Sequence, residues 1–413
     1  MRKVILASAL LSAVGISFAT NGDNLIGVSP ASRGMGGIGV GMPVGPIDAI
    51  YRNPAWMTSY KGFNLSFGGI LFLPEVKAKS NVTPMGPMNP PASATSQSKV
   101  FVVPEVGIVN QINDKLTFGI GAFGVSGMGV DYRNNIRLLN THTTFQFMRV
   151  IPTLAYKVND AISVSGAVHL AYGSLDMGIT FCDNYDNPTA CVNLGGGQSQ
   201  TYGIGAQLGI AYNMGDFVYA GLTYQSPVNM TYKRVFDSNG DGQFEDLKLT
   251  QPLELALGVG VKPMDNLKMG MDIRWINWKR AKGYKHFQWK DQWVIALGGE
   301  FKPMQKLALR AGYNFGKSPI RGGAKNPMNA NNIPNFAAPF SDFQIAVFNL
   351  IGFPAITEHH ITLGLGYEFT KNFGIDLAYK HAFNKKVRAT AGPMFVEAQN
   401  AQNAISIGLN WKF

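Results

Sequence analysis

From Gly62 onward the chain repeats one pattern, in which about ten residues of alternating apolar and polar or small character end in a turn. Because successive side chains of a strand point to opposite faces, each run has one apolar face. With earlier runs and the final ISIGLNWKF, the pattern predicts about fourteen strands. The clearest runs are LELALGVGV from Leu253, LKMGMDIRW from Leu267, WVIALGGEF from Trp293, LALRAGYNF from Leu307, ITLGLGYEF from Ile361 and FGIDLAYKH from Phe373.

No apolar stretch has the length of a membrane-spanning helix, although 46% of the 413 residues are hydrophobic. Backbone groups in lipid must be hydrogen-bonded within the protein, which leaves a closed barrel as the alternative to helices. A content of 48 glycines, 26 phenylalanines and only 15% charged residues suits such a barrel better than a soluble enzyme. The sequence therefore predicts an all-β fold, a transmembrane antiparallel β-barrel of about 14 strands in the cell outer membrane.

The first nineteen residues have the features of a secretory signal peptide. Arg2 and Lys3 precede an apolar run over residues 4–16, and Ser17-Phe18-Ala19 provides a small-residue cleavage site. The apolar run is shorter than the roughly 20 residues that a helical anchor needs. We therefore expect cleavage after Ala19.

Connections between the predicted strands alternate in length. Those at 157–161, 213–216, 262–266, 302–306 and 370–372 are short, whereas those at 74–98, 182–198, 237–251 and 318–358 are long. Short periplasmic turns and long outer loops are typical of outer-membrane barrels. The terminal aromatic Phe413 on the strand AISIGLNWKF indicates a substrate of the barrel-assembly machinery.

Residues 20–61 do not follow the strand pattern. The segment is rich in glycine and also carries aliphatic and aromatic side chains, whereas a disordered leader would be more polar. We therefore expect it to fold into the barrel lumen as a hatch. The chain is thus divided into a signal peptide (1–19), an N-terminal hatch (20–61) and a transmembrane β-barrel (62–413).

Charged side chains on the predicted strands fall on the face opposite the apolar one. They would be costly against lipid, so we place them in the lumen. We hypothesise that they form an ion-pair lattice with the hatch; the alternative is a hydrated lumen without specific hatch contacts. The lattice residues are Arg33, Asp48 and Arg52 on the hatch and Glu254, Asp272, Arg274, Glu300, Arg310, Glu368 and Asp376 on the wall, where Lys268 and Lys380 also face inward.

The chain is basic, and its formal net charge of +11 falls to +9 when Arg2 and Lys3 leave with the signal peptide. The basic residues are scattered and export removes the chain from nucleic acid, so nucleic acid is not an expected partner. Outer-membrane lipid, lipopolysaccharide and anionic substrates are the partners that this charge favours, through Lys and Arg on loops.

Two motifs fall in the predicted outer loops. Cys182 and Cys191 belong to an exported chain, which predicts a disulfide closing one loop; two free thiols or half of a metal site are the alternatives. Asp237, Asn239 and Asp241 have the spacing of the first half of a calcium loop, although Lys248 stands where the EF-hand has a bidentate glutamate. Ca²⁺ binding and a plain polar turn both stay open there, and no other cofactor is expected.

The segment RNPAWMT at residues 52–58, with SRGMGG at residues 32–37, resembles the hatch of the FadL/TodX family of outer-membrane channels for long-chain fatty acids and aromatic hydrocarbons. Further similarity extends to the C-terminus. The resemblance implies a fourteen-stranded barrel with a hatch motif at Asn53, Pro54 and Ala55. It also implies passive uptake of a hydrophobic small molecule, which is captured at the outer loops and released laterally after the hatch rearranges.

In that family the substrate leaves at a kinked third strand, which here matches residues 116–132. Glycines weaken strand pairing, so we place the kink at Gly124, Gly127 and Gly129; alternatively, glycine only lets neighbouring aromatic rings pack there. The longest loop contains an apolar stretch that suits a lid or a capture surface, or else a local core. Our substrate-binding candidates are Lys279, Arg280 and Lys282, for a carboxylate, and Phe343, Phe348 and Phe353 in that stretch.

Other functions fit the sequence less well. A general porin, or a structural barrel without hydrophobic cargo, is the alternative, but an open porin would not carry the long N-terminal leader. The six histidines are scattered except for the adjacent His359 and His360, whose side chains point to opposite faces of one predicted strand, and the chain lacks Gly-x-Ser-x-Gly and His-Glu-x-x-His motifs. We therefore expect a monomeric channel and not an enzyme, with a cargo that stays open between fatty acids and aromatic hydrocarbons.

Overall fold

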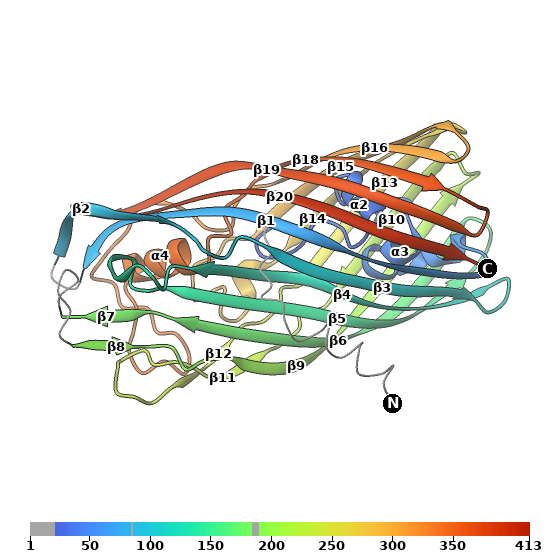
Figure 1. Cartoon of the computed structure of the whole chain (residues 1–413). Coiled ribbons are helices and arrows are strands. Elements are labelled where there is room, and N and C mark those ends of the chain that lie inside the picture. The colour runs from blue at the N-terminus through green and yellow to red at the C-terminus, as the bar shows by residue number, and fades with distance from the viewer. Residues whose placement is uncertain (1–20, 84–85, 184–189) are drawn as a thin grey trace, which may run out of the picture.

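The strands of the computed structural model form one closed antiparallel barrel (Figure 1). Fourteen wall strands follow one another in chain order, and the last pairs with the first, which confirms the predicted fold class. The structure describes residues 21–83, 86–183 and 190–413, so the predicted signal peptide lies outside the described residues. The wall strands are β1 (Phe63–Thr83), β3 (Phe101–Gln111), β4 (Leu116–Asp131), β5 (His142–Lys157), β6 (Ile162–Gly178), β9 (Ser199–Met214), β10 (Val218–Gln225), β13 (Glu254–Met264), β14 (Leu267–Ile276), β15 (Gln292–Met304), β16 (Leu307–Gly316), β18 (His359–Glu368), β19 (Phe373–Ala391) and β20 (Met394–Lys412).

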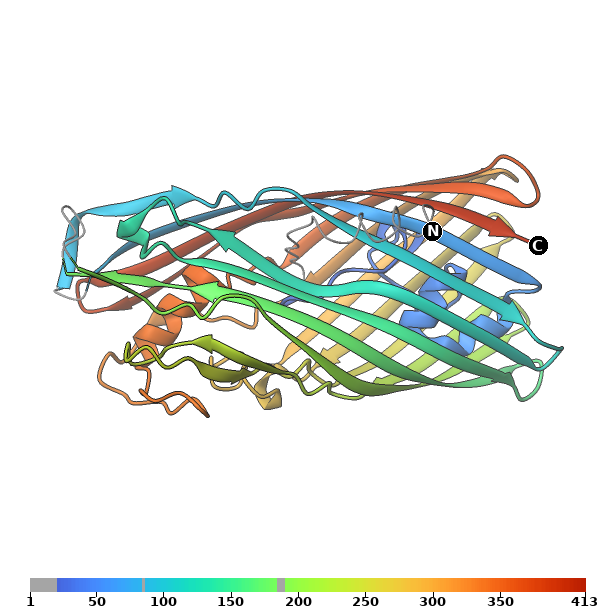
Figure 2. The same ribbon diagram turned by 60° about the horizontal axis from the view of Figure 1, so that its bottom comes forward.

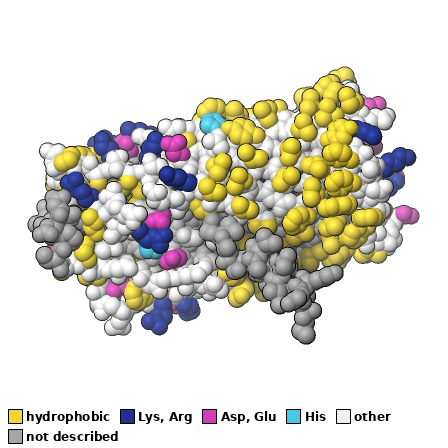
Figure 3. Space-filling model, in the orientation of Figure 1, with side chains coloured by type: hydrophobic (Ala, Val, Ile, Leu, Met, Phe, Trp, Pro, Cys, Tyr) yellow, Lys and Arg dark blue, Asp and Glu magenta, His cyan; other side chains and the backbone are white. Residues whose placement is uncertain are grey.

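The alternation in the sequence corresponds to the two faces of the wall. On β13, Leu255 and Leu257 are exposed on the outside, whereas Glu254 and Ala256 are buried in the lumen. The same arrangement on neighbouring strands makes an apolar belt on the half of the barrel nearer the C-terminus (Figure 3). Among the described residues, no helix is long and apolar enough to cross a membrane.

The N-terminal segment lies inside the barrel, in the half that holds the short turns (Figures 1 and 2). It contains the helices α2 (Pro30–Gly34) and α3 (Pro46–Arg52) and the 3-10 helix η1 (Pro54–Ser59). Proline stands at the first turn of each, where its missing N–H leaves no hydrogen bond unmade. Ser29 caps α2, and Asn53 ends α3 and caps η1. We call residues 21–61 the hatch.

The wall is taller on one side than on the other. Strands β1, β19 and β20 have 21, 19 and 19 residues, whereas β14 and β16 have 10 each. Loops and short elements occupy the long-loop end of the barrel (Figure 1). They are η2 (Ile136–Leu138), β7 (Thr180–Cys182), β8 (Cys191–Asn193), β11 (Thr231–Phe236), β12 (Glu245–Lys248), η3 (Trp278–Arg280), β17 (Gly323–Ala324), α4 (Asp342–Val347) and a π-helical turn, η4 (Phe348–Gly352).

One predicted loop is wrong. Residues 74–98 were expected to connect two strands as a long loop, but β1 continues to Thr83 and pairs with β2 (Gly86–Thr95). The outer face of this extension carries polar side chains such as Lys77 and Lys79, so the apolar alternation that identifies a lipid-facing strand is absent. Strands that extend beyond the apolar belt can pair without apolar side chains on their outer face, because that face is in contact with water and not with lipid.

Candidate functional site

Glycines on the inner wall let the hatch approach the barrel backbone to backbone. A Cβ built on Gly312 would lie 2.1 Å from the backbone nitrogen of Gly36, and one on Gly221 would lie 1.9 Å from the carbonyl oxygen of Val40. No side chain fits at such distances, so these wall positions require glycine. We call the wall glycines that meet the hatch the glycine ring: Gly107, Gly119, Gly209, Gly221, Gly258, Gly260, Gly270, Gly298, Gly312, Gly316, Gly364 and Gly408.

Asp272 on β14 holds the hatch through its main chain. Its carboxylate accepts hydrogen bonds from the backbone N–H groups of Gly39, Val40 and Gly41 at 2.8, 2.8 and 2.9 Å. Thr362 on β18 accepts one from the N–H of Gly36 at 2.9 Å. A charged acceptor with three short N–H donors makes strong hydrogen bonds in a site that excludes water. The middle of the hatch is therefore fixed to the wall.

The hatch motif Asn53-Pro54-Ala55 lies at the turn between α3 and η1. The Asn53 amide donates to the carbonyl oxygens of Val40 in the hatch and Ile210 in β9, both at 3.0 Å, and its Oδ1 accepts from the N–H of Ala55 at 3.2 Å. Both ends of this one side chain are thus engaged, which ties two parts of the hatch to the wall. Only a primary amide supplies that combination of donors and acceptor at this size.

Ion pairs join the hatch to the wall at two places and not as one lattice. Arg33 pairs with Glu105 on β3 at 2.6 Å, and Arg52 pairs with Glu254 on β13 at 3.5 Å, where Arg274 also lies 3.4 Å from Glu254. A further group lies wholly within the wall. It consists of Arg310 with Glu300 and Asp376, and of Lys268 with Glu300.

Two predicted lattice residues are placed differently. Asp48 accepts hydrogen bonds from the backbone and hydroxyl groups of Ser29, so it joins α2 to α3 within the hatch, and burial raises the pKa of its carboxyl to about 6. Glu368 is exposed at the short-turn end, because the strand passes out of the lumen there. Glu105 was missed, although it is the lone charged residue in β3 and alternation places it inward.

The strand predicted to kink, β4, has an irregularity at the expected glycines. Its register with β5 shifts between Gly124 and Ser126. Within the described residues, the pairing of β4 with β3 ends at Phe123, opposite Glu105. Further along β4, the carbonyl oxygen of Asp131 accepts a hydrogen bond at 2.9 Å from the N–H of Gln97, in the segment that precedes β3. We call the interval between these points the β3–β4 break. Gly127 and Gly129 lie on β4 within it.

The start of the hatch occupies the edge of β4 along this break. The N–H of Leu25 donates to the carbonyl oxygen of Val125 at 2.8 Å, and the N–H of Gly127 donates to that of Asp23 at 3.0 Å. The side chains of Asn24 and Ser126 lie 2.5 Å apart. Residues 23–25 therefore pair with the edge of β4 beyond Phe123, whereas β3 pairs with the same edge from Thr117 to Phe123.

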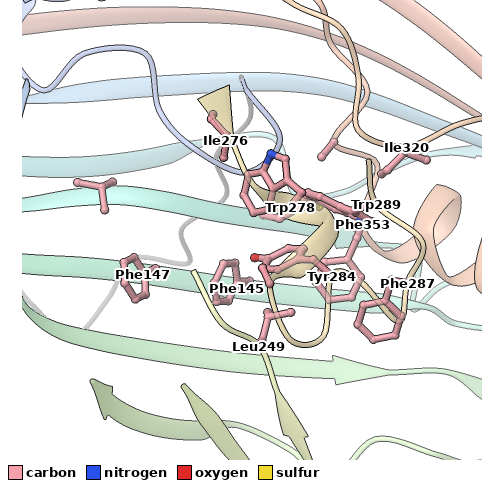
Figure 4. Close-up of a cluster of buried hydrophobic side chains, with 14 of the residues drawn as sticks. Phe145, Phe147, Leu249, Ile276, Trp278, Tyr284, Phe287, Trp289, Ile320 and Phe353 are labelled. Atoms are coloured by element: carbon pink, nitrogen blue, oxygen red, sulfur yellow. The ribbon is translucent and has the colours of Figure 1, made fainter. Parts of the chain in front are cut away.

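A cluster of aromatic side chains lies beside this segment (Figure 4). The rings of Trp278, Tyr284 and Trp289 have centroids 4.6 to 5.1 Å apart, and Tyr284 donates a hydrogen bond to Asp23. Burial raises the pKa of the Asp23 carboxyl to about 7. The cluster thus connects the loop after β14 with the start of the hatch. We call this the aromatic cluster: Phe145, Phe147, Leu249, Ile276, Trp278, Tyr284, Phe287, Trp289, Ile320, Phe348 and Phe353.

The substrate-binding candidates fall into two groups. Phe343, Phe348 and Phe353 are buried, and Phe348 stacks between Phe287 at 4.4 Å and Phe353 at 5.0 Å. The candidate cations Lys279, Arg280 and Lys282 are exposed instead, because the chain leaves the lumen after Trp278, whose ring occupies the interior. Other cations that face the lumen include Arg149, bonded to His169 and Gln225, and Lys380, whose ammonium lies 5.1 Å from the centroid of the Phe72 ring.

The outer loops contain the two predicted motifs. Cys182 and Cys191 form a disulfide between β7 and β8. The Asp237 carboxylate accepts from the N–H groups of Gly240, Asp241 and Gly242, so backbone donors surround it as in a polar turn. Asn239 donates to Asp241 at 3.0 Å. Within the described part of the chain, no three His, Cys, Asp or Glu residues are grouped as metal ligands, and Ca²⁺ binding stays an untested prediction.

Comparison with known proteins gives consistent matches. Residues 24–334 match the family model described as outer membrane protein transport protein (OMPP1/FadL/TodX). The chain is 22% identical to outer membrane protein P1 of Haemophilus influenzae, covering 98% of this chain and 94% of that protein. It is 20% identical to the long-chain fatty acid transport protein of Escherichia coli, covering 88% of each.

Solved structures share the fold. The toluene transporter TodX of Pseudomonas putida superposes with a TM-score of 0.68 at 18% identity, over 94% of this chain and 99% of that one. A FadL homologue from Pseudomonas aeruginosa gives a TM-score of 0.70 at 16% identity, over 95% of this chain and 100% of that one.

Proposed function

Because the chain belongs to the OMPP1/FadL/TodX family of outer membrane transport proteins, we propose that it carries small hydrophobic molecules inward, past the aromatic cluster and out through the β3–β4 break. The relatives named above transport long-chain fatty acids and toluene. The observation that carries the proposal is that a hatch segment, and not β3, covers the edge of β4 beside a buried aromatic cluster.

The apolar character of the cluster supports a hydrophobic cargo. A site lined by Phe, Trp, Ile and Leu stabilises apolar molecules by removing their surface from water. The hatch meets the wall around the lumen through the glycine ring, which speaks against an open hydrophilic porin. Members of the family are transport channels, and we propose no catalytic role for this chain. We also propose that it works as a monomer.

Release sideways requires only a small part of the hatch to move. Residues 36–41 are held by the Asp272 carboxylate and by close backbone contacts, and Asn53 anchors the hatch motif. Residues 23–25 are held by two backbone hydrogen bonds to β4 and by the side-chain hydrogen bonds of Asn24 with Ser126 and of Asp23 with Tyr284, with no wall glycine pressed against their backbone. Each such bond contributes about 1 kcal/mol, so this segment is the part that a ligand can displace at the lowest free-energy cost. We therefore propose that residues 23–25 gate the break.

Lys380 bears on whether the channel takes a charged or an uncharged cargo. Its ammonium is buried and, among the described residues, has no hydrogen-bond partner, and it lies beside Phe72 in a small apolar cluster with Leu25. A buried unpaired ammonium is costly, and a carboxylate cargo would pair with it. Lys380→Met should then weaken oleate uptake several-fold and leave toluene uptake unchanged. Equal uptake of oleate by both proteins would favour uncharged cargo.

The gate can be tested with a reversible lock. Asn24 and Ser126 are bridge partners whose side chains already touch, so Asn24→Cys with Ser126→Cys should form a disulfide that fixes the hatch to β4 at the break. Oxidised proteoliposomes should lose uptake of labelled oleate and toluene, and a reductant should restore it. If uptake persists in the oxidised double variant, the route through the break is wrong.

A second lock serves as the matched control. Thr58 in the hatch and Ser163 in β6 also have side chains in contact, at 2.8 Å, but far from the break. Thr58→Cys with Ser163→Cys should leave uptake unchanged, because that end of the hatch stays fixed in the proposed mechanism. Loss of uptake in this variant would show that the whole hatch moves. Single-cysteine variants and the reduced wild type control for the native disulfide.

A further inference from the structure

The tall side of the wall presents basic side chains to its outer surface above the apolar belt. Register places Lys77 of β1 and Lys386 of β19 on opposite sides of Gln399 in β20, with Lys79 and Arg388 on opposite sides of Glu397 one step further out. We call Lys77, Lys79, Lys386 and Arg388 the basic face. In Figure 3, dark-blue and magenta side chains gather over this part of the wall, to the left of the apolar belt.

Positive charge exceeds negative charge on this face. Glu397 is buried beneath Lys386, at 2.8 Å, and Arg388, at 3.9 Å, and Arg388 also stacks on Phe395. Lys77 pairs with Glu75 at 2.7 Å. Four cations thus share two carboxylates. The side chains of Lys77, Lys386 and Arg388 remain 50 to 56% exposed, and Lys79 is exposed as well. Like charges at neighbouring positions of a sheet repel, which an external anion would relieve.

The height of the basic face selects the kind of anion. The apolar belt on this side ends at Leu73 on β1 and at Phe383 on β19, just above the group of Tyr379, His381 and Asn403, in which Asn403 is bonded to both other side chains. Lys77 stands four residues above Leu73, about 13 Å along the strand and about 10 Å in height for a typical strand tilt. A phospholipid headgroup lies at the belt edge, whereas the phosphates of a lipopolysaccharide saccharide extend above it.

The lateral spacing also fits a molecule with more than one phosphate. Cations on β1 and β19 are separated by two strand spacings, about 10 Å. A single amphiphile can therefore place acyl chains on Leu71, Ile405 and Leu377, which are exposed on the belt below, and phosphates on the cations above. Strands β14 and β16 have only 10 residues each, so the wall there has no comparable extension above the belt.

We infer that the basic face is a binding site for lipopolysaccharide, held by the phosphates of its inner saccharide. The expected partner thus meets cations on the extended strands β1 and β19 and not cations on loops. Bound lipopolysaccharide would cover the outer surface of β1, β20 and β19. Strand β1 pairs with β3, which borders the β3–β4 break. The site is independent of the proposed cargo, because none of its residues faces the lumen.

Native mass spectrometry of the full-length barrel, refolded in detergent free of lipopolysaccharide and titrated with a phosphorylated lipopolysaccharide, tests the inference. The variant Lys77→Gln, Lys79→Gln, Lys386→Gln should bind on the order of a hundredfold more weakly, since each cation near an anionic lipid surface contributes about a factor of five. Arg388 is retained because its stacking on Phe395 is structural. Unchanged binding by this variant would overturn the site.

Two controls make the result specific. Lys115→Gln, Lys306→Gln, Lys371→Gln removes the same charge from exposed positions at the short-turn end and should bind lipopolysaccharide as the wild type does. Equal weakening in this control would mean that net charge alone drives binding, and the basic face would not be a site. Lipopolysaccharide stripped of its phosphates should bind the wild type as weakly as the intact lipid binds the triple variant; tight binding of the stripped lipid would also overturn the inference.

Discussion

The two halves of the lumen are filled by different means. In the half with the short turns, the hatch lies tightly against the glycine ring, and its backbone touches the wall backbone at Gly221, Gly258, Gly298, Gly312 and Gly364. Asp272 also binds three of its N–H groups. In the half with the long loops, side chains from several loops pack ring against ring, as with Phe287, Phe348 and Phe353. The first kind of contact depends on fixed distances and directions, whereas the second depends mainly on contact area.

This difference indicates which half can change shape. Hydrogen bonds weaken steeply when the donor–acceptor angle leaves its preferred range, and backbones already in close contact cannot approach further without a clash. Aromatic rings that pack through dispersion can move against one another with smaller losses, since offset and edge-on arrangements are similarly favourable. The hatch half should therefore hold one conformation, and the aromatic cluster should adapt to a ligand. Three variants test this contrast.

Gly312→Val should have the largest effect. Its Cβ would lie 2.1 Å from the backbone nitrogen of Gly36, and neither backbone can move without breaking other hatch contacts. We expect a loss of about 3 kcal/mol or more in stability, or failure to close the barrel around the hatch. Heat-modified mobility in gel electrophoresis would report the folded fraction. Gly166→Ala is the control, because its Cβ meets only a leucine methyl at 3.9 Å. A folded valine variant with wild-type stability would contradict the rigid half.

Asp272→Asn should have an intermediate effect. The amide cannot accept hydrogen bonds from three N–H groups with both of its atoms, so buried donors lose their partner. We expect a loss of about 2 kcal/mol and faster hydrogen exchange at the amides of residues 39–41. Asp265→Asn, at an exposed turn, is the matched control and should exchange as the wild type does. Unaltered exchange in Asp272→Asn would mean that the glycine contacts alone hold the hatch.

Phe348→Leu should have the smallest effect on stability. The aromatic stack can close over the smaller side chain, so we expect a loss below about 1.5 kcal/mol. Binding of a hydrophobic fluorophore should change several-fold, while exchange at residues 39–41 stays the same. Phe301→Leu on the lipid face is the control and should alter neither readout. If Phe348→Leu loosened the hatch amides as much as Asp272→Asn, the two halves would behave as one unit.

The sequence predicted the rigid architecture better than the adaptable site. Lipid requires an apolar outer face, and that requirement gives wall strands a repeating pattern, as in LELALGVGV on β13. The hatch was identified from the motif at Asn53, Pro54 and Ala55 and from its composition. The position of the kink on β4 could also be predicted, because glycines in a strand interior weaken pairing.

Other parts of the site could not be predicted from the sequence. The pairing of Arg33 with Glu105 depends on how the hatch is rotated in the lumen, which no local pattern records. Lys279, Arg280 and Lys282 were placed at the binding site because they lie at the end of a strand that matches the family's binding region, but the chain turns outward after Trp278. Residues 23–25 carry no strand pattern of their own, since their pairing with β4 arises only once the wall has a break.

Closure of the barrel sets an order of events during its formation. Strand β20 pairs with β1 from Asn64 to Ser80, and its Gly408 lies against Pro30 of the hatch. Contacts this close leave no passage for threading α2 and α3 into a finished cylinder. The hatch must be in place before the last strand pairs with the first. Formation of the barrel thus couples the N-terminal hatch to the C-terminal strand, and an interruption before β20 pairs with β1 would leave an open sheet around the hatch.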